Sequence, residues 1–381
     1  MTEHDPSKFI RAISSKLATR SRHVCVLLGA GTSRAAGLPD VKGLTKIVLD
    51  KLVGDQKVRF EEQLKARNLE EALSRVRRIQ ALLSPGQTLD GLTSESAAEL
   101  DRAVCEHIIA ALSIEQANLV PARQFARWVR RSAYQMPLEI FTVNYDLVLE
   151  TAFDKHKAPY FDGFCGVVEA RFHVDLVEGE LASGPLPSFF ARLWKLHGSV
   201  NWAWDGPQII RYGRAVEAGQ VAAIYPSELK YDESRRFPFV VLQDRLRRSL
   251  NVPESLMLVS GYAFGDQHLN ELIFDAAERH ERTEVVAFLF DGITDTLAER
   301  AQSLPNLQLV APVEAVIGGV RGAWKEKEPC KYWEGDKLTL VDFAVLADFL
   351  STISPGSDER DSATRELLKL ISEGATQGGA K

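Results

Sequence analysis

A short apolar run that passes directly into a glycine-rich turn constrains the fold of this chain most strongly. Residues 24–28 are all apolar, a pattern typical of a strand that is covered on both faces of a parallel sheet. The turn that follows consists of Gly29, Ala30, Gly31, Thr32 and Ser33. The two glycines lack a Cβ atom, so the backbone can turn sharply and bring N–H groups and two hydroxyls close to a phosphate. A plain turn between strand and helix has the same pattern, so this stretch needs support from other parts of the chain.

Three later segments, residues 141–146, 193–202 and 257–266, repeat this form: each is an apolar run that ends in polar residues or glycine. Parallel strands of a doubly wound sheet carry their site residues at the carboxyl ends, which meet at one crevice. We therefore predict an α/β fold with a Rossmann-like doubly wound parallel sheet. The residues at the predicted crevice are Asn144, Asp146, His197, Ser260, Gly261, Tyr262 and Asp266.

The first three of these residue types suit proton transfer and the orientation of a sugar. Asn144 offers a donor and an acceptor that do not titrate, which can orient a ribose hydroxyl or a water molecule. His197 can take a proton from either group, and Asp146 can support the arrangement through a second hydrogen bond. Each also has a structural alternative, because Asn and Asp are common in turns and single histidines often serve packing. Asp266 equally fits an N-cap for the helix that follows.

The motifs and their order over roughly residues 20–315 resemble those of the sirtuin family of NAD-consuming enzymes. The resemblance is carried by the turn at 29–33, Gly37-Leu38-Pro39-Asp40, Asn144 with Asp146, and His197-Gly198. The forms Asn144-Tyr145-Asp146, Lys195-Leu196-His197-Gly198-Ser199 and Gly261-Tyr262-Ala263-Phe264-Gly265-Asp266 are similar to its bacterial branch, whose members hydrolyse NAD in anti-phage defence. The short build is similar to the stand-alone members that pair with a HerA-type hexameric ATPase.

The resemblance implies that NAD is the substrate, and we expect no metal. It implies catalytic roles for Asn144, His197 and Asp146. It also implies NAD contacts from the following residues: Asn144, His197, the turn at 29–33, Gly37, Asp40, Ser260, Gly261, Tyr262 and Asp266. The implied reaction is cleavage of the nicotinamide–ribose bond to give nicotinamide and ADP-ribose. Gating by oligomerisation or by an ATPase partner, and a homo-oligomeric state, are implied in the same way.

Two other functions stay open. A protein-lysine deacylase would use the same NAD site, but deacetylating sirtuins typically carry a four-cysteine zinc module. The four cysteines here, Cys25, Cys105, Cys165 and Cys330, form no Cys-x-x-Cys pair, so we predict no zinc module. The other alternative is an NAD-binding assembly subunit without catalysis.

Composition and charge exclude some partners. The formal net charge is −6, so bulk electrostatics favour no direct contact with nucleic acid. The first twenty residues contain no uninterrupted apolar segment, and we expect a cytoplasmic protein without a membrane partner.

The pattern of apolar residues predicts how the chain is divided. We assign residues 1–41 and 133–315 to the NAD-binding domain, 42–132 to a helical insertion subdomain, 316–353 to a closing segment, and 354–381 to a flexible tail with a short helix. Apolar residues at helical spacing predict insertion helices over residues 69–83 and 100–111. Between residues 158 and 187 glycine and proline are frequent, and we expect loops with a short strand over 170–177.

Overall fold

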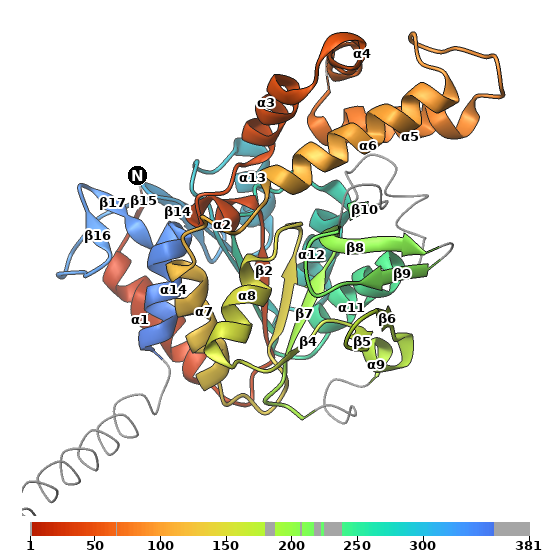
Figure 1. Cartoon of the computed structure of the whole chain (residues 1–381). Coiled ribbons are helices and arrows are strands. Elements are labelled where there is room, and N and C mark those ends of the chain that lie inside the picture. The colour runs from red at the N-terminus through yellow and green to blue at the C-terminus, as the bar shows by residue number, and fades with distance from the viewer. Residues whose placement is uncertain are drawn as a thin grey trace, which may run out of the picture.

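The structure is a computed structural model that describes residues 2–65, 67–179, 187–205, 208–216, 222–224 and 238–353 (Figure 1). The predicted tail with its short helix, residues 354–381, lies outside the described residues.

A twisted sheet forms the centre of the molecule. In the described ranges it has ten strands, in the order β1-β15-β14-β13-β12-β11-β2-β3-β7-β4. The strands are β1 (Glu3–His4), β2 (Val24–Leu28), β3 (Glu139–Thr142), β4 (Tyr160–Phe161), β7 (Ala191–Lys195), β11 (Leu256–Ser260), β12 (Glu284–Phe288), β13 (Leu307–Val310), β14 (Glu314–Ile317) and β15 (Val320–Trp324). Neighbours from β4 to β13 are parallel, and β14 runs antiparallel to both β13 and β15.

The central strands are apolar on both faces because helices cover both faces. Alternate residues of β2 point to opposite sides: Val26 belongs to one hydrophobic cluster and Leu27 to the other. The first face is covered by α1 (Pro6–Ala18), α7 (Val120–Arg131), α8 (Val148–His156) and α14 (Phe343–Thr352). The second face is covered by α11 (Phe239–Leu250), α12 (Gln267–Arg279) and α13 (Asp295–Ser303). This arrangement confirms the predicted α/β, Rossmann-like doubly wound fold.

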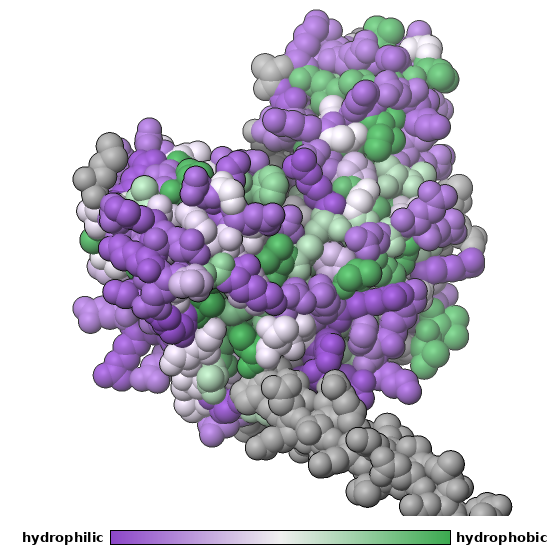
Figure 2. All heavy atoms as spheres, turned by 90° about the vertical axis from the view of Figure 1, so that its left-hand side faces the viewer, coloured by the Kyte–Doolittle hydropathy of each residue, from purple (hydrophilic) through white to green (hydrophobic). Residues whose placement is uncertain are grey.

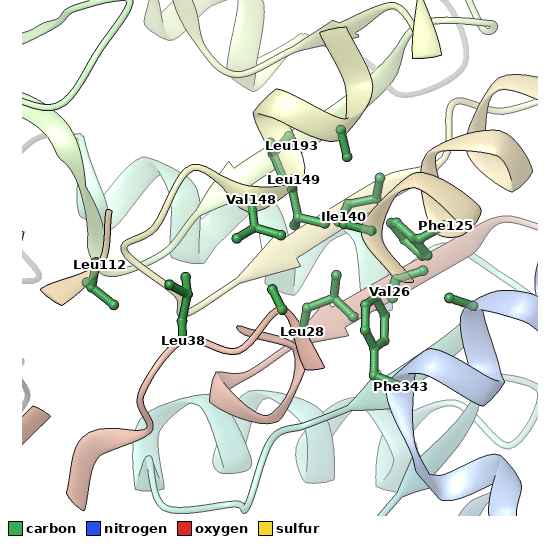
Figure 3. Packing of buried hydrophobic residues seen from close by; sticks show 14 of the residues in the cluster. Val26, Leu28, Leu38, Leu112, Phe125, Ile140, Val148, Leu149, Leu193 and Phe343 are labelled. Carbon is green, nitrogen blue, oxygen red and sulfur yellow. The ribbon is translucent and has the colours of Figure 1, made fainter. Parts of the chain in front are cut away.

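Figure 3 shows the packing on the first face. Val26 and Leu28 of β2 and Ile140 of β3 lie beside Phe125 of α7 and Phe343 of α14. All five are buried, so the first helix layer and the sheet share one continuous core.

The insertion between β2 and β3 contains a projecting group of helices. They are α3 (Val41–Lys51), α4 (Gly54–Leu64), α5 (Leu69–Leu82) and α6 (Ser94–Ala111), which we call the arm. Figures 1 and 2 show the arm standing out from the rest of the molecule. The predicted insertion helices correspond to α5 and α6, and α6 starts earlier than predicted because Thr93 and Ser96 form a capping box.

The last helix of the predicted insertion, α7, is not part of the arm. Its buried side chains, among them Phe125 and Trp128, pack against α8 and α14 in the first helix layer. The arm is therefore shorter than the predicted insertion at 42–132.

A second, antiparallel sheet lies beside the main one, in the order β10-β8-β9-β6-β5 within the described residues. Its strands are β5 (Phe164–Cys165), β6 (Ala170–Phe172), β8 (Gly198–Asp205), β9 (Gln208–Arg211) and β10 (Ala222–Ile224). The predicted strand over 170–177 is wrong in its second half, which forms the short helix α9 (Val174–Glu178). There the chain turns to bury Val177, and the Val177 carbonyl accepts a hydrogen bond of 2.8 Å from Arg245 instead of a strand partner.

The closing segment continues the main sheet. The predicted boundary between residues 315 and 316 falls inside β14, which pairs with β13 on one side and β15 on the other. A small hairpin of β16 (Trp333–Glu334) and β17 (Lys337–Leu338) then leads to α14. In the described ranges, every helix is either too short or too polar to cross a membrane.

The strand order places a crevice beside β2. From β2 the chain builds outward through β3 and β7, and then returns to the other side of β2 with β11. Loops that leave the carboxyl ends of β2, β3 and β11 therefore diverge at this point, which is where open α/β sheets bind ligands.

Candidate functional site

Two adjoining cavities lie at this switch point. The smaller, of about 550 Å³, is lined by residues that follow β2, β3, β7 and β11 and by residues of the arm. The larger, of about 1750 Å³, extends toward the loops after β12. Both cavities share Ala30, Val41, Gly261, Tyr262, Ala263 and Gln267 in their walls. A ligand with two halves can thus place one half in each cavity, with its middle against the residues that both cavities share.

His197 and Asp266 form a hydrogen-bonded pair in the smaller cavity. His197 follows β7 and Asp266 follows β11, and both are nearly buried. The distance between His197 Nε2 and Asp266 Oδ2 is 3.1 Å. Because an ionised carboxylate only accepts, Nε2 carries the proton of this bond, which leaves Nδ1 as the nitrogen that can accept a proton.

Asp266 also begins the helix that follows, as the sequence indicated. Its Oδ1 accepts from the backbone N–H groups of His268 at 3.1 Å and Leu269 at 3.3 Å. The carboxylate therefore caps α12 with one oxygen and orients His197 with the other.

Asn144 faces the smaller cavity and also fastens the glycine turn. Its side-chain amide donates to the Gly29 carbonyl at 3.0 Å and to Thr32 Oγ1 at 2.9 Å. Both amide hydrogens are used in this way, so only the oxygen Oδ1 is left as a hydrogen-bonding group toward a ligand.

Asp146 is held beside Asn144 by the helix after the turn. Ser33 donates its hydroxyl to Asp146 Oδ2 in a short hydrogen bond, and the N–H of Val148 donates to Oδ1 at 2.9 Å. Asp146 is only 5% exposed but lines the smaller cavity. The structure thus brings together Ser33, Asn144, Asp146, His197 and Asp266, from four different strand ends.

The glycines of the turn are needed for close packing against the loop after β11. A Cβ atom on Gly29 would lie 2.4 Å from the Gly261 carbonyl oxygen, and one on Gly31 would lie 2.7 Å from Gly261 Cα. Gly261 itself has φ +66°, a left-handed conformation that favours glycine. The N–H groups of Gly29 and Gly31 donate to the carbonyls of Ser260 and Gly261.

The groups that the sequence predicts for phosphate binding therefore mainly form hydrogen bonds within the protein. Thr32 donates its hydroxyl to the Gly29 carbonyl at 2.8 Å, and its backbone N–H donates to the same oxygen. Ala30 is the first residue of α2 (Ala30–Ala35) and is the residue of the turn that lies in the wall shared by both cavities.

Of the other residues predicted to contact the cofactor, some line these cavities and some do not. Tyr262 lines both cavities, and burial, followed by the Asp266 carboxylate, raises the pKa of its hydroxyl. Asp40 lines the larger cavity and caps α3 by accepting from the Gly43 N–H at 2.8 Å. Gly37 and Ser260 lie outside the described linings of both cavities.

Gly37 ends α2 in the left-handed conformation, with φ +83°. The Gly37→Ala variant is expected to lose about 1 kcal/mol of unfolding free energy from backbone strain, with no steric clash, because no atom lies within 4 Å of the added Cβ. Urea unfolding measures this loss, and Gly37→Asn, which tolerates the same conformation, should lose less. Weaker NAD binding by a stable Gly37→Asn variant would instead indicate a direct contact.

The arm supplies a residue to the site, Glu70, that was not predicted from the sequence. Glu70 of α5 lines the smaller cavity and accepts a hydrogen bond of 3.0 Å from the hydroxyl of Tyr145, which lies between Asn144 and Asp146. Burial, followed by the Glu70 carboxylate, raises the pKa of Tyr145, so its hydroxyl stays protonated as a donor. The amphipathic pattern of α5 indicates its apolar face but does not say what its polar face touches.

Lys195, the last residue of β7, was also given no role. The available signal was a lysine at the end of a strand with a continuous apolar pair, Leu193 and Trp194, before it, because lysine is rarely buried without a partner.

The walls of the smaller cavity are acidic. Its described lining contains Glu70, Glu71, Asp146 and Asp266, and includes neither Lys nor Arg. The described lining of the larger cavity carries both signs: its carboxylates outnumber its three basic residues, Arg34, Lys42 and Arg300. Of these, Arg34 lies over the Phe290 ring at 5.9 Å. The smaller cavity therefore suits a cationic group, and the larger one can accept an anion near Arg34.

Residues with metal-ligand chemistry do not cluster in this part of the molecule. Within the described ranges, no three His, Cys, Asp or Glu side chains are arranged to hold a metal ion. The four cysteines are free thiols, with Cys25 and Cys105 buried in the core.

Part of the chain is similar to a known protein family. Residues 138–309 match the family model of the SIR2-like domain. The matched part runs from the start of β3 to β13 and includes Asn144, His197 and Asp266, whereas the glycine turn and the arm precede it. No curated protein matches the chain. The match supports a sirtuin-like domain and an activity related to NAD, because SIR2-like domains are typically NAD-dependent enzymes.

Proposed function

We propose that the protein is an NAD hydrolase that cleaves the bond between nicotinamide and ribose. The observation that carries the proposal is the convergence of Asn144, Asp146 and the His197–Asp266 pair on one cavity, next to the glycine turn. The reaction consumes one water molecule and yields nicotinamide, ADP-ribose and a proton.

The two cavities fit the two halves of NAD. The smaller one would hold the nicotinamide riboside and the larger one the adenosine, with the diphosphate crossing at Ala30 within reach of Arg34. Asp291 and Gly292, after β12, line the larger cavity and are available to the adenosine half. The walls of the larger cavity also carry aromatic side chains, among them Phe264 and Phe290, which suit a base.

The charge of the smaller cavity favours the proposed reaction. The nicotinamide ring of NAD is cationic and already a good leaving group, and positive charge moves onto the ribose in an oxocarbenium-like transition state. Carboxylates in the wall stabilise that charge. Asn144 Oδ1 would orient the ribose or the water, and His197 Nδ1 would accept the proton from water or from a ribose hydroxyl.

The test is to incubate the purified protein with NAD and to separate the products by chromatography. We expect nicotinamide and ADP-ribose in equal amounts, and no reaction with NADH, whose ring is neutral and a poor leaving group. NAD binding without nicotinamide release, with and without added partner, would contradict the proposal and favour an assembly subunit. Formation of acetyl-ADP-ribose only with an acetylated peptide would favour a protein-lysine deacylase.

We propose further that the activity serves anti-phage defence and is gated by homo-oligomerisation or by a HerA-type ATPase in the cytoplasm. The support is the resemblance of the motifs, together with apolar residues exposed on and beside the arm: Val53 is 74%, Val58 66% and Leu82 73% exposed. The same assay with and without a neighbouring ATPase, and light scattering of the free protein, test the gating and the oligomeric state.

A further inference from the structure

Lys195 is a buried cation directly beneath the loop that carries Asn144 and Asp146. Its side chain is 3% exposed and lies at the carboxyl end of β7, two residues before His197. A buried ammonium group is stable only when hydrogen-bond acceptors and an opposite charge surround it.

The ammonium group of Lys195 has a partner for each of its three hydrogens. It donates to the Glu150 carboxylate at 2.8 Å and to the Tyr145 carbonyl at 3.4 Å, and makes a short bond to the Asp146 carbonyl. The Tyr145 carbonyl also accepts from Ser199 Oγ at 3.2 Å and from the Val200 N–H at 2.9 Å. The loop after β3 is thereby fixed by its backbone to β7, β8 and α8.

Little free space separates this anchor from the reacting groups. A cavity of only about 10 Å³ lies between them, lined by Ser33, Asn144, Asp146, Glu150 and Lys195 among others. The lysine compensates the charge of Glu150, while the Asp146 side chain stays bonded to Ser33 and Val148. One strand end thus supplies both the anchor of the loop and the histidine beside it.

We propose that Lys195, paired with Glu150, is a positioning residue for the reaction: it holds the backbone at Tyr145 and Asp146 so that Asn144 and Asp146 face the substrate. This role rests on the proposed NAD hydrolysis. Displacement of reacting groups by about 1 Å costs about 100-fold in rate, so loss of the anchor should lower kcat and leave the KM for NAD nearly unchanged.

The test separates positioning from stability by removing both charges at once. Lys195→Met alone leaves Glu150 buried without a counter-charge and is expected to lose stability. The double variant Lys195→Met/Glu150→Leu replaces the ion pair with apolar side chains and should be more stable than Lys195→Met alone, although the Asp146 carbonyl loses its bond from Lys195. We expect it to fold, to retain the KM for NAD, and to lose about 30- to 100-fold in kcat. Lys155→Met, an exposed lysine on the same helix as Glu150, should keep the wild-type kcat.

A second readout does not depend on the reaction. In the folded protein the N–H groups of Asn144 and Val148 donate to Thr142 Oγ1 and Asp146 Oδ1, and amide hydrogen exchange at these positions should accelerate at least about 10-fold in the double variant. Wild-type kcat, or unchanged exchange in a folded double variant, would overturn the role of Lys195. If the wild-type protein releases no nicotinamide, the proposed function fails, and the positioning role in that reaction fails with it. Accelerated exchange would then still show that Lys195 anchors the loop.

Discussion

The His197→Ala variant is expected to release nicotinamide at least about 100-fold more slowly than the wild-type protein, because a positioned general base contributes about 10²–10⁴ in rate. NAD binding should persist, since Ala30, Arg34 and the larger cavity are unchanged. Nicotinamide release is measured by chromatography and NAD binding by calorimetry. His173→Ala, in which the exposed histidine before α9 is removed, serves as the matched control.

The pairing with Asp266 can be tested separately from helix capping. Asparagine caps helices as well as aspartate does, so Asp266→Asn preserves the start of α12 but removes the carboxylate that orients His197. We expect a loss of about 10-fold, and a clearly smaller loss when Asp266→Asn is added to His197→Ala, because the paired residues act largely as one unit. Independent, multiplicative losses would contradict a coupled pair, and full activity of His197→Ala would remove the histidine from the mechanism.

The Glu139→Gln variant is expected to lose about 3–5 kcal/mol of unfolding free energy, the usual cost of leaving a buried charge without its partner. The Glu139 carboxylate is fully buried and accepts hydrogen bonds from Arg245, Ser249 and the Trp194 indole, and Arg192 lies 3.6 Å away. The amide of glutamine leaves both guanidinium groups without a counter-charge. Urea unfolding measures the loss.

The unfolding free energy of the wild-type protein should fall at acidic pH. The part of this fall that comes from Glu139 should be absent from the Glu139→Gln variant. Burial alone would raise the pKa of Glu139, but the Arg245 guanidinium and its hydrogen bonds hold that pKa below its ordinary value. The stabilisation is therefore complete above the ordinary glutamate pKa and is lost as the pH falls through the lowered one.

An exposed ion pair is the control for this prediction. Asp275 and Arg279 on α12 lie 2.9 Å apart and are more than half exposed, so Asp275→Asn should cost below about 0.5 kcal/mol. A Glu139→Gln variant within about 1 kcal/mol of the wild-type protein would contradict the buried network. The network lies at the amino ends of β3 and β7, away from Asn144 and His197, so folded variant protein should retain its activity.

The main sheet could be predicted from sequence because its strands carry strong local signals. The apolar run at 24–28 corresponds to β2, and the segments that end near Asn144, His197 and Gly261 correspond to β3, β7 and β11. Parallel strands buried on both faces need continuous apolar runs, so these elements are visible without any knowledge of their neighbours. In the second sheet β5 and β6 are only two and three residues long, and their pairing depends on contacts that no local pattern records.

The site could be predicted only as a set of strand ends. The sequence indicates that Asp266 begins a helix, but not that its second oxygen meets a histidine on another strand, 69 residues earlier. It likewise does not predict the bond between Glu70 and Tyr145, which joins the arm to the loop after β3. Residue roles that depend on distant contacts required the three-dimensional arrangement.

The position of β2 between β3 and β11 has a consequence for the order in which the chain can assemble. Cys25 pairs with Glu139 on one side and with Met257 on the other, so the first long strand waits for partners that are made much later on the ribosome. The conformation of Gly29 and Gly31 depends on the carbonyls of Ser260 and Gly261. A nascent chain that stops short of residue 261 therefore has no finished turn after β2, and the cleft can form only after that residue has been made.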